Sequence, residues 1–163
     1  MIKDIKTILY ATDLSNTSVY AFRYALCLAN ALDARLHLLH VVEPVSEEMR
    51  MTLQLFVADR KARDVAINQR RETVKALLEE RQAVYWQHLP KDDQALRDRV
   101  DDIEIVEGFA AEEILKKADS LSAGMILMGS HEQGVSHTFL GTVAKRVLRR
   151  SRIPTLIVPY VQD

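Results

Sequence analysis

The sequence has little cysteine, glycine or proline, and it has no long apolar run: it contains one cysteine, five glycines and four prolines. A lone cysteine excludes an intramolecular disulfide, and because Cys27 stands among apolar neighbours we expect a small core residue rather than a reactive thiol. No apolar stretch approaches the roughly 20 residues that a membrane-spanning helix needs. The N-terminus lacks the apolar segment of a secretory signal peptide. We therefore expect a cytoplasmic protein that does not enter membranes.

An excess of charge of either sign is also missing. The chain has 22 basic and 23 acidic residues, which gives a formal net charge of −1. Such a chain has no overall basic field that would attract nucleic acid or an anionic membrane surface. With 163 residues, of which 48% are apolar and 28% charged, it is long enough for a substantial hydrophobic core. We expect residues 1–163 to form one domain that binds neither nucleic acid nor membrane.

Five short apolar runs alternate with segments of helical periodicity. Strands are predicted at Thr7–Thr12, Arg35–Val42, Ile103–Glu107, Met125–Met128 and Ile153–Val158. This alternation predicts an α/β fold, a doubly wound parallel sheet with helices on both faces. Pro154 and Pro159 flank the last run, and proline suits the edge of a sheet or the start of a strand.

A long helical insert, about residues 45–83, interrupts the alternation. It carries an apolar stripe formed by Met49, Leu53 and Phe56, and then a charged stretch from Asp59 to Glu72. The pattern fits either one long helix or two helices with a bend, and the charged stretch is expected to be a solvated face. Residues from about 84 to 101 read as an irregular polar segment.

The residues that follow two of the strands point to a ligand. Met128 leads into Gly129, and Gly141 with Thr142 opens an amphipathic helix. A glycine loop and a helix N-terminus present bare backbone N–H groups, which favour an anion such as phosphate. Asp13, which ends the first strand, could accept hydrogen bonds from an adenine or a ribose, or it could cap the helix that follows. Ligands of open α/β sheets bind beyond the carboxyl ends of the strands, where the strand order reverses.

Three enzyme motifs are absent. Gly129 and Gly134 have the spacing of a P-loop, but Val135 and Ser136 stand where that motif requires lysine and then serine or threonine. Neither the dinucleotide fingerprint G-x-G-x-x-G nor the hydrolase elbow G-x-S-x-G occurs. These absences exclude a P-loop NTPase and an α/β-hydrolase of the usual kind.

The histidines do not form a convincing metal site. His131 and His137 have loop spacing and no clear third ligand, and His37 and His40 have odd spacing on a strand and so face opposite sides of the sheet. We therefore expect no bound metal beyond an ion that accompanies a ligand.

Taken together, four short segments resemble the universal stress protein family. They are Thr12–Ser15, Leu39–Val42, Met128–His131 and Leu140–Ala144, and the terminal Ile153–Pro159 fits the family's last strand. The resemblance spans essentially the whole chain. It implies a five-stranded sheet of order 3-2-1-4-5, a role in stress survival or signalling, and a homodimer formed through the last strand, Ile153 to Val158.

The resemblance also implies a set of ligand contacts. Family members that bind ATP carry G-x-x-G, nine further residues and then G-S/T. Here Gly129 matches the first glycine and Gly141 with Thr142 the closing pair, but Glu132 replaces the second glycine and eight residues, 133–140, fill the interval. By position, Asp13 and Val41 hold adenine, Met128 and Gly129 line the ribose and phosphate side, and the helix start holds phosphates. The nucleotide-binding candidates are Thr12, Asp13, Val41, Met128, Gly129, Ser130, Gly134, Gly141, Thr142 and Val143.

These observations lead to two main hypotheses. The first is a homodimeric stress regulator that binds ATP or a related adenine nucleotide, with Mg²⁺ as an accompanying ion. Since no lysine or general base is placed for catalysis, any ATP hydrolysis is expected to be slow. The second is a nucleotide-free dimeric adaptor that acts through contacts with an unidentified protein, favoured by Glu132, the shortened loop and the charged stretch Asp59–Glu72. An adenylate-transferring enzyme ranks last, because no S-G-G-x-D or H-x-G-H signature occurs.

Overall fold

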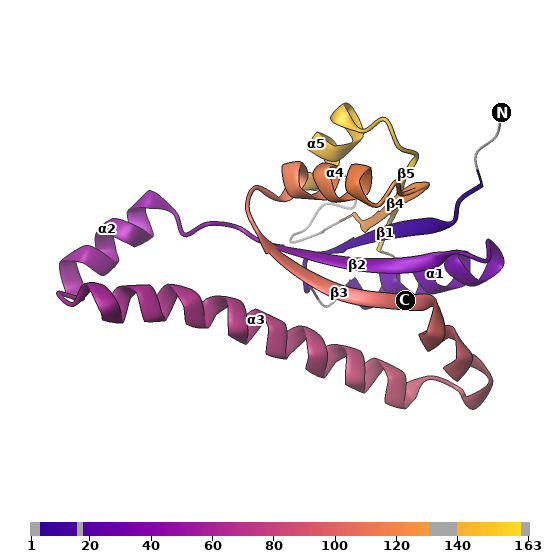
Figure 1. The fold of residues 1–163 in the computed structure, drawn as a ribbon, viewed down its shortest axis with the longest axis horizontal. Coiled ribbons are helices and arrows are strands. Elements are labelled where there is room, and N and C mark those ends of the chain that lie inside the picture. Colours follow the sequence, from indigo (N-terminus) through magenta and orange to yellow (C-terminus); the bar gives the residue numbers. More distant parts are fainter. Residues whose placement is uncertain (1–3, 16–17, 131–139, 161–163) are drawn as a thin grey trace.

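The fold is a parallel sheet with helices on both faces (Figure 1). The computed structural model describes residues 4–15, 18–130 and 140–160. Its five strands lie in the order β3-β2-β1-β4-β5, and every neighbouring pair is parallel. This confirms the predicted α/β class and strand order. The strands are β1 (Thr7–Thr12), β2 (Arg35–Val42), β3 (Val100–Glu107), β4 (Met125–Gly129) and β5 (Thr155–Val158).

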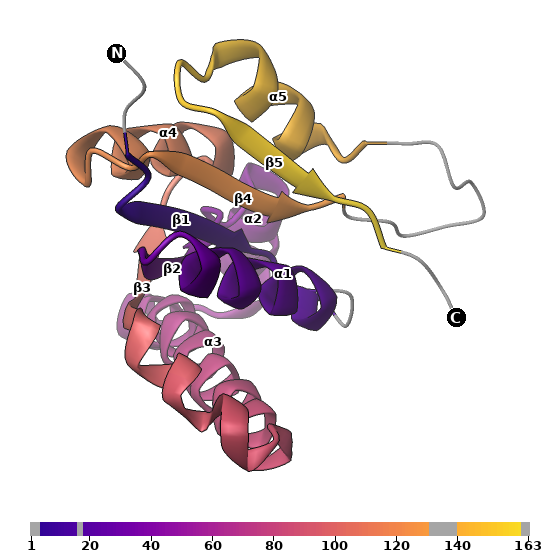
Figure 2. The same cartoon turned by 90° about the vertical axis from the view of Figure 1, so that its right-hand side faces the viewer.

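Three helices cover the two faces of the sheet. Helix α1 (Ser18–Ala31) lies on one face, and α4 (Ala110–Ser120) and α5 (Thr142–Arg150) lie on the other (Figure 2). Successive residues of a strand point to opposite faces. Accordingly, Ile8 and Tyr10 of β1 belong to the hydrophobic cluster under α1, whereas Leu9 and Ala11 belong to the cluster under α4 and α5.

The predicted helical insert forms two helices. Helix α2 (Glu47–Phe56) begins where the Ser46 side chain accepts a hydrogen bond from the Met49 N–H, and α3 (Arg60–His88) begins where Asp59 caps the Lys61 N–H. Helix α3 runs along the β3 side of the sheet, and α2 lies beyond the sheet at its far end (Figure 1).

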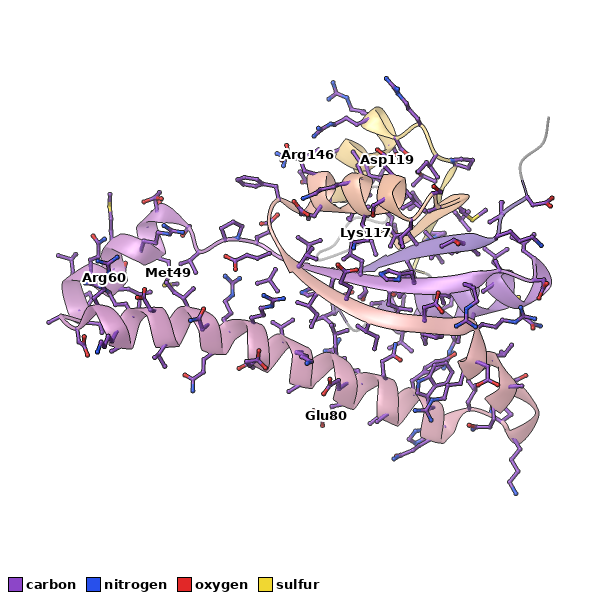
Figure 3. The ribbon with its side chains drawn as sticks, in the orientation of Figure 1. Met49, Arg60, Glu80, Lys117, Asp119 and Arg146 are labelled. Carbon is purple, nitrogen blue, oxygen red and sulfur yellow. The ribbon has the colours of Figure 1, made fainter. Side chains whose placement is uncertain are left out.

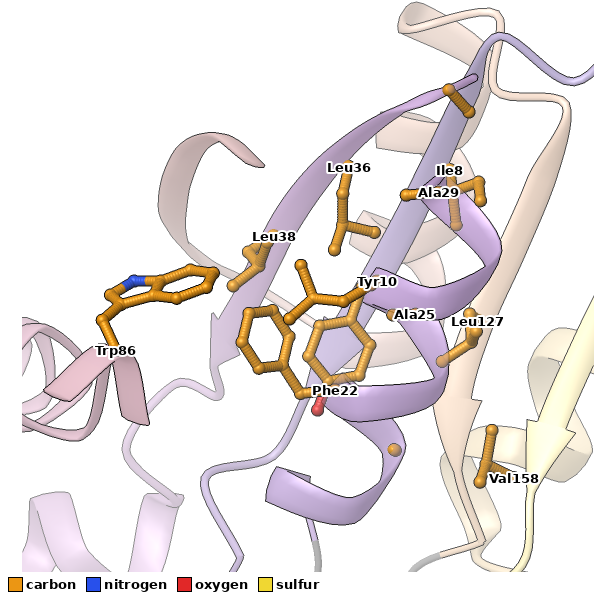
Figure 4. Close-up of a cluster of buried hydrophobic side chains, with 13 residues drawn as sticks. Ile8, Tyr10, Phe22, Ala25, Ala29, Leu36, Leu38, Trp86, Leu127 and Val158 are labelled. Atoms are coloured by element: carbon orange, nitrogen blue, oxygen red, sulfur yellow. The ribbon is translucent and has the colours of Figure 1, made fainter. Parts of the chain in front are cut away.

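The expectation of an irregular segment from residue 84 was wrong. Helix α3 continues to His88 because Trp86, which is only 7% exposed, packs its indole against Phe22 at 5.8 Å between ring centroids. Figure 4 shows this side chain reaching from α3 towards Leu38 and Phe22. A 3₁₀ helix, η1 (Lys91–Arg99), then leads into β3. The aromatic contact extends the helix through a stretch whose polar sequence suggested a loop.

Two strand boundaries also differ from the prediction. Strand β3 begins at Val100 instead of Ile103. The Arg35 Nε of β2 donates to the Asp101 carboxylate at 2.8 Å, and this bond offsets the acidic charge at the start of β3. Strand β5 begins at Thr155 instead of Ile153, because Pro154 has no N–H to donate. Strand β5 lies at the sheet edge, as its flanking prolines predicted.

Cys27 is exposed, so its expected core position was wrong. The buried stripe of α1 consists of Ala21, Phe22, Ala25, Leu26 and Ala29. One residue beyond Leu26 lies about 100° further round the helix, which turns Cys27 away from the sheet.

Besides the packing of Trp86 against Phe22, polar contacts hold helix α3. Of its 29 residues only Leu78 and Trp86 are buried, and α2 buries none of its residues. The Arg70 Nη1 donates to the Glu43 carbonyl at 3.0 Å, the Arg71 Nη2 donates to the Ile105 carbonyl at 3.2 Å, and Arg81 donates to the Leu14 carbonyl. Within residues 4–15, 18–130 and 140–160, no helix combines the length and apolar character required to cross a membrane.

A histidine joins the ends of two central strands. The His40 Nδ1 of β2 lies 2.8 Å from the Thr12 carbonyl of β1. Burial lowers the pKa of His40 below its usual value of 6.5, and the Thr12 carbonyl and the Asp13 charge only partly offset this effect. The ring is therefore neutral near pH 7 and carries its hydrogen on Nδ1, the nitrogen that faces the carbonyl.

Replacing Trp86 by alanine should lower the free energy of unfolding by about 3–5 kcal/mol, because the change leaves a cavity between α3 and α1. Urea denaturation followed by circular dichroism measures the loss. Val84→Ala is the matched control on the same helix, since Val84 is 49% exposed, and a change within about 0.5 kcal/mol is expected. Equal effects of the two substitutions would contradict the docking of α3 through Trp86.

Acid should destabilise the protein through His40. The unfolded chain takes up a proton near the ordinary pKa of 6.5, whereas folded His40 resists protonation. The stabilisation is thus complete above about pH 6.5 and is lost as the pH falls towards the lower folded pKa. His40→Asn retains an N–H near the Nδ1 position and does not titrate. Urea denaturation between pH 7 and 5 should show a shallower loss for this variant, and identical slopes would refute the assignment.

Candidate functional site

A cavity of about 490 Å³ opens at the carboxyl ends of β1, β2 and β4. This is the place where the strand order reverses between β1 and β4. Its walls come from the strand ends, from the N-termini of α4 and α5 and from the middle of α3. The lining residues are Tyr10, Ala11, Thr12, Asp13, Ser15, Ser18, Leu39, His40, Val41, Val42, Glu43, Arg70, Val74, Ala110, Ile114, Met128, Gly129, Gly141, Thr142, Val143 and Ala144.

The loop after β1 is braced by its own side chains. The Asp13 Oδ1 accepts a hydrogen bond from the Ser15 N–H at 2.9 Å, and the Thr12 Oγ1 accepts from the Leu14 N–H at 3.3 Å. Leu14 has a φ of 63°, a left-handed conformation that a bulky residue adopts only when its surroundings require it. An ionised carboxylate accepts several hydrogen bonds. Bracing of the loop and contact with a ligand are therefore compatible roles for Asp13.

The N-terminus of α5 forms the opposite wall. Gly141 is the N-cap residue, and no side chain of the described residues caps the helix. The first N–H groups of a helix have no partner within the helix, and they carry the positive end of its dipole. Gly141, Thr142, Val143 and Ala144 all line the cavity. Such N–H groups can bind an anion, and the binding of phosphate at this wall stays a prediction.

The backbone conformation at Gly141 does not require a glycine. Its φ of −56° and ψ of 154° are values that any residue adopts. A side chain at this position would instead occupy space at the cavity wall.

The charged groups of the described lining are unevenly placed. Asp13 and Glu43 are acidic, and Arg70 is the one permanently cationic side chain among the described lining residues. Tyr10 lies deep in the wall, where burial raises the pKa of its hydroxyl, which donates to the Ser18 carbonyl at 2.7 Å. The neutral ring of His40 presents an Nε2 that can accept a hydrogen bond.

Most of the predicted binding residues come together at this cavity. Eight line it: Thr12, Asp13, Val41, Met128, Gly129, Gly141, Thr142 and Val143. Ser130 does not, since its N–H donates to the Val158 carbonyl at 2.9 Å and its Oγ accepts from the Tyr160 N–H at 3.3 Å, both towards the β5 side. Gly134 lies outside the described residues, as do His131, Glu132 and His137.

Sequence reasoning missed the wall that α3 contributes. Arg70 and Val74 line the cavity at a spacing of one helical turn. Their spacing was visible in the sequence, but nothing there showed which side of the charged insert would meet the sheet. Among the residues that the structure describes, no group of three or more His, Cys, Asp or Glu side chains is placed to hold a metal ion.

Comparisons with known proteins match this chain over almost its full length. Residues 4–159 match the family model described as the Universal stress protein family. Universal stress protein MJ0577 of Methanocaldococcus jannaschii is 30% identical over 156 residues, which are 94% of this chain and 94% of the relative.

Solved structures share the fold. One, from work on the structure-based assignment of the biochemical function of hypothetical protein MJ0577, has a TM-score of 0.65 and 26% identity, and the match covers 99% of this chain and 100% of that one. Another, a universal stress protein in complex with cAMP, has a TM-score of 0.58 and 21% identity over 96% of this chain and 98% of that one. With the family model matched over residues 4–159, this chain belongs to the universal stress protein family.

Proposed function

We propose that this protein binds an adenine nucleotide, in the first instance ATP, in the cavity at the carboxyl edge of the sheet. The observation that carries the proposal is the meeting of residues far apart in the sequence, Asp13, Val41 and Gly141–Val143, around one space of about 490 Å³. In the proposed mode the base lies beside Asp13 and Val41 and the phosphates lie against the N-terminus of α5. A protein of the same fold was solved in complex with cAMP, so an adenine nucleotide is a reasonable ligand to test first.

The proposed role is regulatory rather than catalytic. Phosphoryl transfer relies on cations that neutralise the charge developing on the phosphates, and the described lining contains no lysine. Mg²⁺ would reach the site with the nucleotide. We further propose a cytoplasmic homodimer formed through the last strand: β5 is the edge of the sheet, and Leu156 and Tyr160 in and beside it are partly exposed.

A second candidate function is that of a nucleotide-free adaptor for another protein, and α2 favours it. Leu55 and Phe56 are 81% and 82% exposed, and Met49 and Met51 are also largely exposed. Figure 3 shows Met49 and Arg60 near the far end of the α2–α3 pair, away from the sheet. Exposed apolar residues gathered on one short helix are typical of a surface that contacts a partner.

The binding of ATP distinguishes the two functions. Isothermal titration of nucleotide-stripped protein with Mg-ATP should give a dissociation constant in the micromolar range, which corresponds to a binding free energy of about −8 kcal/mol. Mass analysis of small molecules released by denaturing the purified protein should identify an adenine nucleotide. If the titration gives no heat at high micromolar ATP and the denatured protein releases no nucleotide, the result favours the adaptor.

Gly141→Val should abolish measurable ATP binding, because a β-branched side chain would enter the space proposed for the phosphates. Leu148→Val is the matched control: it places the same residue on an exposed part of the same helix, and its affinity should equal that of the wild type. Circular dichroism checks that both variants fold. Unchanged affinity in Gly141→Val would show that the phosphates lie elsewhere.

A further inference from the structure

Helix α3 reaches the cavity through two side chains, and one of them, Arg70, is hydrogen-bonded to the chain after β2. The Arg70 Nη1 donates to the carbonyl of Glu43, the residue directly after β2, at 3.0 Å. Val74, one turn further along the helix, also lines the cavity. The guanidinium is therefore held at the β2 end of the space by a bond to the sheet domain itself.

The sheet order places Arg70 away from the proposed phosphate wall. Strand β2 and strand β4 flank β1 on opposite sides, so their ends are two strand spacings, roughly 10 Å, apart. The phosphate wall belongs to Gly129 at the end of β4 and to α5, whereas Arg70 is bound at the end of β2 beside Val41 and Val42. A nucleotide that lies across β1 with its phosphates at α5 places its base at the Arg70 end.

The chemistry of arginine suits that position. A guanidinium is planar and weakly hydrated, and it stacks on flat aromatic rings while its edge donates hydrogen bonds. Arg70 already uses one edge nitrogen on the Glu43 carbonyl. Its plane is thus partly ordered before a ligand arrives, which reduces the entropy lost on contact.

We propose that Arg70 contacts the base of the bound nucleotide with its guanidinium plane, so that α3 forms the outer wall of the base subsite. The inference rests on the proposed adenine-nucleotide function and assigns a residue to it that lies outside the family's glycine pattern. It gives the long insert a direct part in ligand binding. It also predicts that Arg70 contacts the base of the nucleotide and not its phosphates.

Arg71 provides a matched control. It is the next residue on the helix and makes an equivalent bond to the sheet, from its Nη2 to the Ile105 carbonyl at 3.2 Å, but it is not part of the cavity lining. Arg70→Ala and Arg71→Ala therefore each remove one arginine–carbonyl bond between α3 and the sheet, and only the first removes a group from the cavity.

The experiment titrates ATP and adenosine into the wild type, Arg70→Ala, Arg71→Ala and Arg70→Lys. Arg70→Ala should weaken both ligands by the same factor, roughly fivefold, the size expected for a partly exposed cation–π contact. Arg71→Ala should bind both ligands as the wild type does. Arg70→Lys keeps the charge without the plane, so it should recover less than half of the loss in binding free energy.

Three results would overturn the inference while leaving the proposed function intact. Equal losses in Arg70→Ala and Arg71→Ala would mean that Arg70 only holds α3 in place. A loss for ATP without a loss for adenosine would assign the contact to the phosphates, and unchanged affinity for both ligands would mean no contact. A wild-type protein that binds neither ligand would instead overturn the proposed function itself, and this inference with it.

Discussion

Burial of the central strand on both faces is the constraint on which the rest of this structure depends. Ile8 and Leu9 of β1 have no exposed surface, and they point to opposite sides of the sheet. Each such side chain stabilises the fold by about 1.5–3 kcal/mol when it is covered, so helices are required above and below. Strand β1 is also paired along both edges, with β2 and with β4. The strand order reverses between β1 and β4, so the connections after these two strands lead to opposite sides of the sheet. The cavity forms between them, at the carboxyl end of β1.

Local sequence patterns predicted the features that depend on this central packing. The apolar runs and their alternation with helical periodicity were sufficient for the fold class, because buried parallel strands leave a strong local signal. The strand order came from the resemblance to the universal stress protein family, and the structure has the same order. The candidate cavity followed from the same topology, since strand ends are brought together by the order of the strands. For Asp13 the sequence left two roles open, and the observed bond to the Ser15 N–H shows how one carboxylate can brace the loop while it faces the cavity.

Features set by long-range packing could not be predicted. Ser130 follows the glycine of β4 in the sequence, yet its hydrogen bonds go to Val158 and Tyr160, partners fixed only when β5 takes the sheet edge. Cys27 is exposed although its neighbour Leu26 is buried, because successive helix residues point about 100° apart. Likewise, the choice between Arg70 and Arg71 as the cavity residue depends on the rotation of α3. Trp86, sixteen residues further along, fixes that rotation by packing against α1.

The helix α2 and the first turns of α3 have a consequence for how this protein can change over time. Since α2 buries no side chain and α3 buries only Leu78 and Trp86, substitutions between Glu47 and Arg63 do not disturb the packed interior. Exposed positions of this kind usually tolerate exchange within about 0.5 kcal/mol. Related chains can therefore diverge freely at this end, acquiring or losing partners, while the sheet and its cavity stay the same. The packed sheet and its cavity are thus separate from a segment whose residues can change with little effect on stability.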